Sequence, residues 1–211
     1  MTDLIMNRHS SRDFDERPVS TDLITKIVSE AQQAPSWENT QPVKVYVAKG
    51  KIAEQIRNQH SESVSANQKS WTEVIPPQSW AKMPKNNMDQ WLADTANFFG
   101  TDMEAFKNAQ QHLFKAPVIL YITVPKDSSN YSTYDAGAFG YGVLLSASSN
   151  GLGAIPAYEF IRFPEEIHAH FSIPSDESLL MGIGLGYASK SILNDWKPKR
   201  TQVADILQIK E

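Results

Sequence analysis

The sequence predicts a single α+β domain, in which helices and strands alternate along the chain around one sheet. Three observations support this class. The 211 residues are enough to build one substantial hydrophobic core. Segments with helical spacing of apolar residues are interleaved with apolar runs typical of strands. No internal repeat, low-complexity tract or linker divides the chain, so we expect one domain over residues 1–211.

The first third of the chain predicts two helices with a strand between them. Apolar residues at i, i+3 and i+4 predict a helix over 20–34, with Ser20 or Thr21 as its N-cap and a proline at its end. Alternating valines predict a strand over 43–48 with two unlike faces. A further helix is expected over 51–60.

The middle of the chain predicts an irregular segment, helical structure and a central strand. Residues 61–87 are polar and interrupted by prolines, which indicates an excursion or lid. Aromatic and aliphatic residues over 88–114 predict one long helix, or two helices that separate near Gly100. The continuous apolar run at 116–125 is typical of a strand buried on both faces.

The last third begins with a helix whose residues are unusually small. Glycine and alanine recur over 135–149, which allows another backbone to approach closely, so this helix is expected to be buried. A short helix at 163–171 and a buried strand at 177–188 follow. Residues 195–211 form a basic loop and a mixed tail.

Composition excludes several classes of function. The net charge of −4, without a basic tract, argues against a nucleic-acid partner. No apolar run approaches the roughly 20 residues of a membrane span, and the first residues do not resemble a secretory signal, so we expect a cytoplasmic protein without a membrane partner. The absence of cysteine removes thiol chemistry. His168 and His170 are two residues apart on a predicted helix, which is poor spacing for metal ligands, and no metal site is expected.

A basic and hydroxyl-bearing cluster lies near the start of the chain. Whether residues 8–12 are helical or extended, Arg8 and Arg12 share a face, and planar guanidinium groups beside Ser10 suit a phosphate dianion. The alternative is that these arginines pair with Asp13 and Asp15 at the surface. Spacing alone favours the surface pairs.

Four segments taken in order resemble the FMN-dependent nitroreductase family. They are "RHSSRDF", "APSWENTQP", "GLGAIPAYEF" and the basic "KPKR" after "GIGLGY". The resemblance covers nearly the whole chain. It implies a mixed sheet flanked by helices and an intertwined homodimer with two FMN sites at its interface. It further implies that the region at about 61–114 is a variable, lid-like cover of the active site.

The resemblance also implies which residues contact FMN. The phosphate would be bound by two basic segments, namely Arg8, His9, Ser10 and Arg12, together with Lys199 and Arg200, although the register of the second segment is open. The flavin ring would be contacted from the partner subunit by Pro35, Ser36, Trp37 and Asn39. Within the same subunit it would be contacted by Asn67 or Gln68, between which the sequence does not decide, and by Pro156, Ala157, Tyr158 and Glu159.

The function implied by this resemblance is an NAD(P)H oxidoreductase. NADH or NADPH would reduce FMN, and a nitroaromatic, quinone or related small organic acceptor would then collect the electrons in a ping-pong mechanism. No catalytic side chain is expected, because the cofactor carries out the chemistry. The preferred nicotinamide and the physiological acceptor are not encoded in any readable motif. The alternative is a non-catalytic or redox-sensing FMN-binding module.

Overall fold

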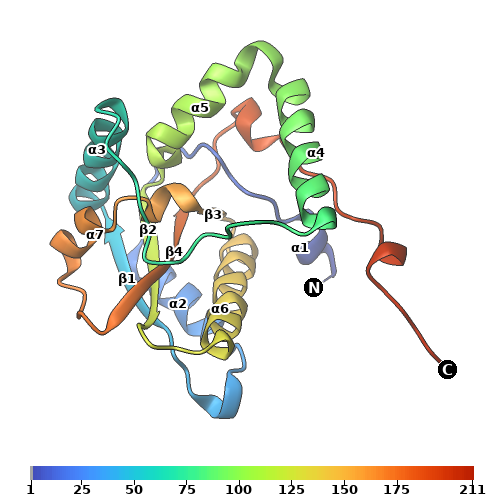
Figure 1. The fold of residues 1–211 in the computed structure, drawn as a ribbon. Helices are drawn as coiled ribbons and strands as arrows, with labels where there is room; N and C mark the ends of the chain where they lie inside the picture. Colours follow the sequence, from blue (N-terminus) through green and yellow to red (C-terminus); the bar gives the residue numbers. More distant parts are fainter. Residues whose placement is uncertain (1) are drawn as a thin grey trace.

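The computed structural model describes residues 2–211, where helices cover both faces of a four-stranded sheet (Figure 1). The strands are β1 (Lys44–Lys49), β2 (Val118–Pro125), β3 (Gly153–Ala157) and β4 (Glu177–Gly186). They lie in the order β1-β2-β4-β3, and each neighbouring pair is antiparallel. An isolated parallel bridge joins Ser10 to Ala154 of β3. The α+β class is confirmed.

The helices precede, connect and follow these strands. They are α1 (Thr2–Asn7), α2 (Thr21–Ala31), α3 (Lys51–Ser65), α4 (Lys82–Phe99), α5 (Met103–Gln111), α6 (Asn130–Ser149) and α7 (Pro164–Phe171). Short 3-10 helices include η1 (Trp37–Asn39), η4 (Tyr158–Ile161) and η5 (Ile192–Asn194). None of the helices within residues 2–211 combines the length and apolar composition that crossing a bilayer requires.

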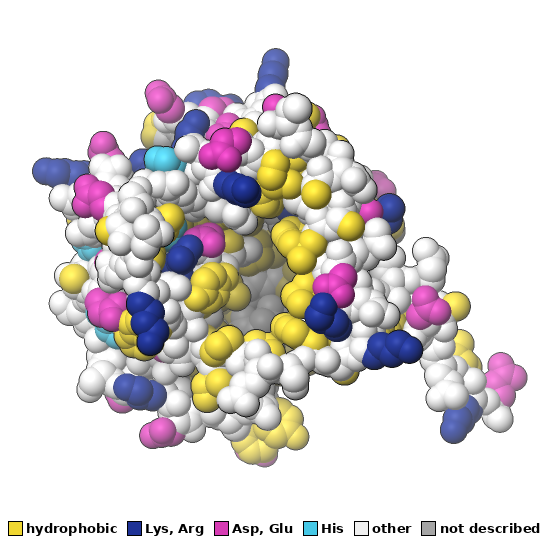
Figure 2. Space-filling view, turned by 45° about the horizontal axis from the view of Figure 1, so that its top comes forward, with side chains coloured by type: hydrophobic (Ala, Val, Ile, Leu, Met, Phe, Trp, Pro, Cys, Tyr) yellow, Lys and Arg dark blue, Asp and Glu magenta, His cyan; other side chains and the backbone are white. Residues whose placement is uncertain are grey.

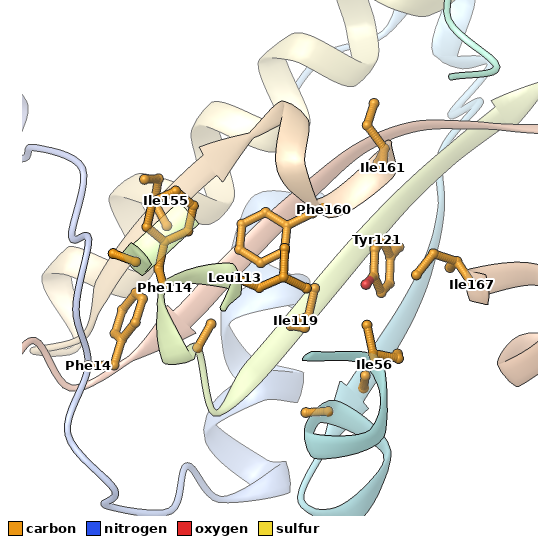
Figure 3. Packing of buried hydrophobic residues seen from close by; sticks show 14 of the residues in the cluster. Phe14, Ile56, Leu113, Phe114, Ile119, Tyr121, Ile155, Phe160, Ile161 and Ile167 are labelled. Atoms are coloured by element: carbon orange, nitrogen blue, oxygen red, sulfur yellow. The ribbon is translucent and has the colours of Figure 1, made fainter. Parts of the chain in front are cut away.

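Strand β2 shows how alternation assigns side chains to the two faces of the sheet. Val118, Leu120 and Ile122 pack in the hydrophobic cluster formed with α2 and α6. Ile119 and Tyr121 point the other way, into the cluster formed with α3, α7 and η4 (Figure 3). Only the last residue of β2 is exposed, which confirms the predicted strand buried on both faces.

Two glycines show how closely neighbouring elements pack against each other. A Cβ added to Gly142 of α6 would lie 3.1 Å from Cα of Ala31, so the small residues of α6 do allow α2 to pack against its backbone. A Cβ on Gly182 of β4 would lie 2.3 Å from Cβ of Phe160. The glycines of β4 therefore allow η4 to pack closely against this strand.

Helix ends differ from the predicted ones where tertiary contacts or exposure decide them. Helix α2 begins as expected, with Ser20 Oγ accepting from the Leu23 amide at 3.2 Å, but ends at Ala31 because its apolar stripe ends there. Helix α6 begins at Asn130, before the predicted start near residue 135. The sequence did not predict this first turn because it is exposed and carries no apolar pattern. Of the two alternatives left open over 88–114, the structure has two helices, which separate at Gly100 with φ of 46°.

The irregular excursion is shorter than predicted. It spans 66–81, because α3 continues to Ser65 and α4 begins at Lys82. The last turn of α3 is held by tertiary hydrogen bonds, including one of 2.5 Å from Ser63 Oγ to Glu166 Oε1. Pro84, which suggested a break, lies in the first turn of α4, where a proline costs no intrahelical hydrogen bond.

Candidate functional site

The segment that follows α1 lies along the β3 edge of the sheet. Ser10 forms the parallel bridge with Ala154, and the Ser11 amide donates to the Ala154 carbonyl at 3.0 Å. A Cβ on Gly153 would lie 2.2 Å from Ser11 Oγ, so only glycine permits this approach. Since β3 continues directly into η4, the structure brings the first and third of the four sequence segments together.

Arg12 is a buried cation without an acidic partner. Its side chain is 6% exposed, and burial lowers the pKa of its guanidinium to about 10. Its Nη1 donates to the carbonyls of Ser10 at 3.1 Å and Trp196 at 3.2 Å, and no carboxylate of residues 2–211 forms an ion pair with it. Burying a charge without a counter-charge is costly. The site therefore favours an anion beside Arg12.

Further donors near this cation have unused hydrogen-bonding capacity. Arg8 Nε and Trp196 Nε1 are buried, and within the described part of the chain neither has a hydrogen-bond acceptor. His9 Nδ1 lies 3.0 Å from the Asn7 carbonyl, to which it can donate. Arg8 and His9 line a cavity of about 260 Å³ together with Ser148, near the C-terminal end of α6. These features fit a phosphate group.

The residue before the C-terminal basic segment contacts Arg12, whereas Lys199 and Arg200 have other partners. Arg12 reaches the carbonyl of Trp196, which directly precedes the basic segment. Lys199 Nζ lies 3.4 Å from Asp94 Oδ2 of α4, and Arg200 Nη1 donates to the Pro198 carbonyl at 2.9 Å. In this arrangement Lys199 is engaged with α4, and Arg200 is exposed.

The end of β3 and the start of η4 present a partly exposed edge. Pro156 and Tyr158 are exposed and Ala157 is half-buried. Glu159 instead turns inward, with Oε2 3.0 Å from Arg162 Nη1 and 3.3 Å from His60 Nε2 of α3. Burial opposes ionisation of Glu159, but the interactions with His60 and Arg162 outweigh it and lower its pKa. Glu159 therefore fixes this loop to α3.

Asn67 and Gln68 lie just beyond the last turn of α3, and both are exposed. Asn67 has φ of 52°, in the left-handed region, where asparagine is better tolerated than most residues. The excursion that follows is attached to η4 and α7, since the Trp71 amide donates to the Arg162 carbonyl at 3.2 Å and the Trp71 indole donates to Glu165.

The loop at 35–41 is held against the N-terminal end of α6. The Trp37 amide donates to Asp135 Oδ2 at 3.0 Å, and the Trp37 ring stacks on Tyr131 with a centroid separation of 5.4 Å. Ser36 Oγ accepts from the amide of Gln41 at 3.0 Å. Pro35 and Ser36 border a cavity of about 330 Å³ in front of Asp135.

This loop and the Arg12 region lie at opposite ends of the same helix. The loop contacts Asp135, whereas Arg8 and His9 share a cavity with Ser148. At a rise of 1.5 Å per residue these two positions on α6 are about 20 Å apart. The first and third segments thus meet within one chain, and the fourth approaches them only through Trp196, whereas Pro35, Ser36, Trp37 and Asn39 are not brought to them.

Three residues that hold these segments were not identified from the sequence. Asp135 is the one charged residue in a helix of small and apolar residues, and this could have marked it as a structural contact. His60 lies on the apolar face of α3, and a polar residue at such a position could have indicated a buried hydrogen bond. Asn194 carries no sequence signal, because its partners are distant in the chain.

One face of the molecule is hollowed. Figure 2 shows a depression rimmed largely by hydrophobic side chains, with lysine and arginine side chains near its margin. In residues 2–211 no cluster of three or more histidine or acidic side chains is arranged to hold a metal ion.

Comparison with known proteins gives consistent matches. The model of the Nitroreductase family matches residues 5–187. The nitrobenzene nitroreductase of Ectopseudomonas oleovorans is 27% identical over 203 residues, which cover 90% of this chain and 87% of that protein. The 4-nitrobenzoate reductase of Pseudomonas putida is 26% identical over 197 residues, covering 89% and 85%. The FMN-dependent nitroreductase NfnB of Mycobacterium smegmatis, solved in complex with NADPH, has the same fold, with a TM-score of 0.91, 17% identity, and coverage of 100% and 97%.

Proposed function

Because the chain belongs to the nitroreductase family, we propose that it is an FMN-dependent oxidoreductase that uses NADH or NADPH to reduce nitroaromatic compounds. The observation that carries this proposal is the buried guanidinium of Arg12, which has no acidic partner in residues 2–211. A phosphate dianion would supply the missing counter-charge through charge-assisted hydrogen bonds. FMN carries such a group at the end of its ribityl chain.

The residues that would hold FMN come from the segments joined at the β3 edge. Arg8, Ser10 and Arg12 would bind the phosphate, and the partly exposed edge formed by Pro156, Ala157 and Tyr158 would lie along the ring. Bound there, FMN supplies a ring that accepts hydride from the nicotinamide and returns electrons to the acceptor, so donor and acceptor would use one position in turn. The protein's part is to orient the cofactor and exclude water.

We propose that the functional unit is a homodimer. The loop at 35–41 lies about 20 Å along α6 from the phosphate-binding segment and does not reach it within one chain. A symmetric dimer would place the loop of each subunit beside the flavin ring bound by its partner. The exposed apolar side chains of the C-terminal tail, among them Ile206 and Ile209, would be covered in the same assembly.

The range of acceptors is part of the proposal. Nitroaromatic compounds are the substrates named for the curated relatives, and quinones are small planar acceptors that the same apolar depression would admit. A protein that binds FMN but does not turn over would instead be a binding or redox-sensing module.

Anaerobic reduction of the FMN-loaded protein tests the proposal. NADH and NADPH are added in parallel, and the loss of flavin absorbance is followed, after which nitrobenzene, 4-nitrobenzoate or a benzoquinone is added. The proposal expects bleaching by at least one nicotinamide and recovery of absorbance with a nitroaromatic acceptor. Binding of FMN without bleaching would favour the non-catalytic module, and failure to bind FMN would overturn the assignment.

A further inference from the structure

Asn194, the last residue of η5, uses its whole side-chain amide to join the two ends of the chain. It is buried, and its Oδ1 accepts from the amides of Arg12 at 2.6 Å and Asp13 at 3.2 Å. Its Nδ2 donates to the carbonyls of Asp13 at 2.8 Å and Ser189 at 3.0 Å. An asparagine side chain offers two acceptor sites and two donors, and all four are occupied.

These contacts fix the residue that carries the buried cation. Arg12 is held at its backbone by Asn194, and its guanidinium is held by the carbonyl of Trp196, only two residues further along the chain. The segment 194–196 therefore holds both the backbone amide and the guanidinium of Arg12. It also places the start of the basic segment 197–200 beside the same region.

We infer that Asn194 is a positioning residue for the anion site, and that it acts by orienting Arg12 toward the phosphate of the bound flavin. This inference rests on the proposed function, in which Arg12 binds that phosphate. Without the Asn194 side chain, the backbone N–H groups of Arg12 and Asp13 would lose their acceptor, and they would move to find water. The guanidinium would move with them.

The same junction supplies a matched control. Ser189 Oγ donates to Asp13 Oδ2, so it also ties the two chain ends together, but it makes no contact with the Arg12 peptide. Ser189→Ala removes this hydrogen bond and the one that Ser189 Oγ accepts from the Ser191 amide at 3.1 Å, while the hydrogen bonds from Asn194 to Arg12 and Asp13 stay in place. Any effect specific to Arg12 should therefore appear in Asn194 variants and not in Ser189→Ala.

The test compares FMN with riboflavin, which has the same ring and lacks only the phosphate. Dissociation constants for both flavins are measured by fluorescence titration with the wild type, Asn194→Ala, Ser189→Ala and Arg12→Met. We expect Asn194→Ala to weaken FMN binding by about tenfold or more, as the loss of a charge-assisted hydrogen bond would. Riboflavin affinity should be unchanged, and Ser189→Ala should retain the wild-type preference for FMN.

A double variant checks the route through Arg12. If Asn194 acts only by orienting Arg12, Asn194→Ala should add no further loss of FMN affinity in an Arg12→Met background. Asn194→Ser, which replaces the amide with a single shorter hydroxyl, is the milder variant should Asn194→Ala fail to fold, and its preference for FMN should be reduced.

The possible outcomes distinguish failure of the inference about Asn194 from failure of the proposed function. An Asn194 variant in which the affinities for FMN and riboflavin fall by the same factor would overturn the inference and make Asn194 a general structural residue, because the preference for FMN would then be unchanged. If the wild type binds FMN no better than riboflavin, the phosphate site itself is absent, and the proposed function fails first.

Discussion

The amide of Trp37 donates a hydrogen bond of 3.0 Å to Oδ2 of Asp135, a carboxylate that is 5% exposed. This contact holds one end of a loop whose backbone is unfavourable on its own, because Glu38 and Asn39 have φ of 47° and 59°. Left-handed conformations in residues other than glycine persist where surrounding contacts enforce them, and they are common at functional loops. Asp135 supplies such a contact.

Asp135→Ala is therefore expected to release the loop. A buried donor would lose its acceptor, at a cost of about 1 to 3 kcal/mol in the free energy of unfolding, measured by urea denaturation. Limited proteolysis should cut within residues 36–41 sooner than in the wild type. Asp135→Asn is the control, because it retains an oxygen acceptor at nearly the same place. Equal cleavage rates for all three proteins would contradict the assigned role.

Arg12→Ala should weaken FMN binding far more than the loss of a surface charge. A charged hydrogen bond to phosphate contributes about 1.5 to 3 kcal/mol, which corresponds to roughly tenfold or more in the dissociation constant. Arg17→Ala is a matched control in the same region, because Arg17 is exposed and pairs with Asp15 at 2.7 Å. Fluorescence titration with FMN should show little change in that variant. If both variants bind FMN equally well, Arg12 is structural.

The inward-turned carboxylate of Glu159 predicts a specific pH dependence of stability. Its pKa is lowered from 4.5 because contacts with His60 and Arg162 outweigh the effect of burial. A carboxyl with a lowered pKa stabilises the fold above its ordinary pKa, and this contribution is lost as the pH falls through the folded value. The difference in unfolding free energy between wild type and Glu159→Gln should thus be largest near neutral pH and shrink below 4.5.

Urea denaturation of both proteins at neutral and acidic pH measures this difference. Glu62→Gln serves as the control, because Glu62 is an exposed residue of the same α3 that His60 belongs to, and surface substitutions usually change stability by less than about 0.5 kcal/mol. A difference for Glu159→Gln that stays constant across this pH range would show that the ionised carboxylate does not stabilise the loop.

Mixing two impaired variants tests whether each FMN site is formed by residues of both subunits. Arg12→Ala would damage the phosphate site, and Asn39→Ala would damage the loop that is expected to reach the partner's site. Randomly re-formed heterodimers contain one intact site, so unfolding and refolding a mixture of the two variants should restore about a quarter of the wild-type sites. Turnover of a nitroaromatic acceptor measures the gain. No gain on mixing, with dimers confirmed by size exclusion, would contradict a shared site.

Much of the fold was predictable because it depends on local patterns. The apolar run of β2, the capping of α2 by Ser20 and the break at Gly100 follow from periodicity and backbone preferences. The extension of α3 to Ser65 was not predictable, because its last turn depends on partners such as Glu166, roughly a hundred residues away in the chain.

By itself, the sequence determined the order of helices and strands, the residues that face the core, and the four segments that resemble a flavin site. Only the tertiary structure decided which of these segments meet. Arg12 and Asn194 are 182 positions apart, yet a hydrogen bond joins them, and Arg12 becomes a desolvated cation only when the sheet edge and the chain ends close around it. Desolvation and hydrogen bonds between distant residues depend on how the whole chain packs, so no local sequence pattern predicts them.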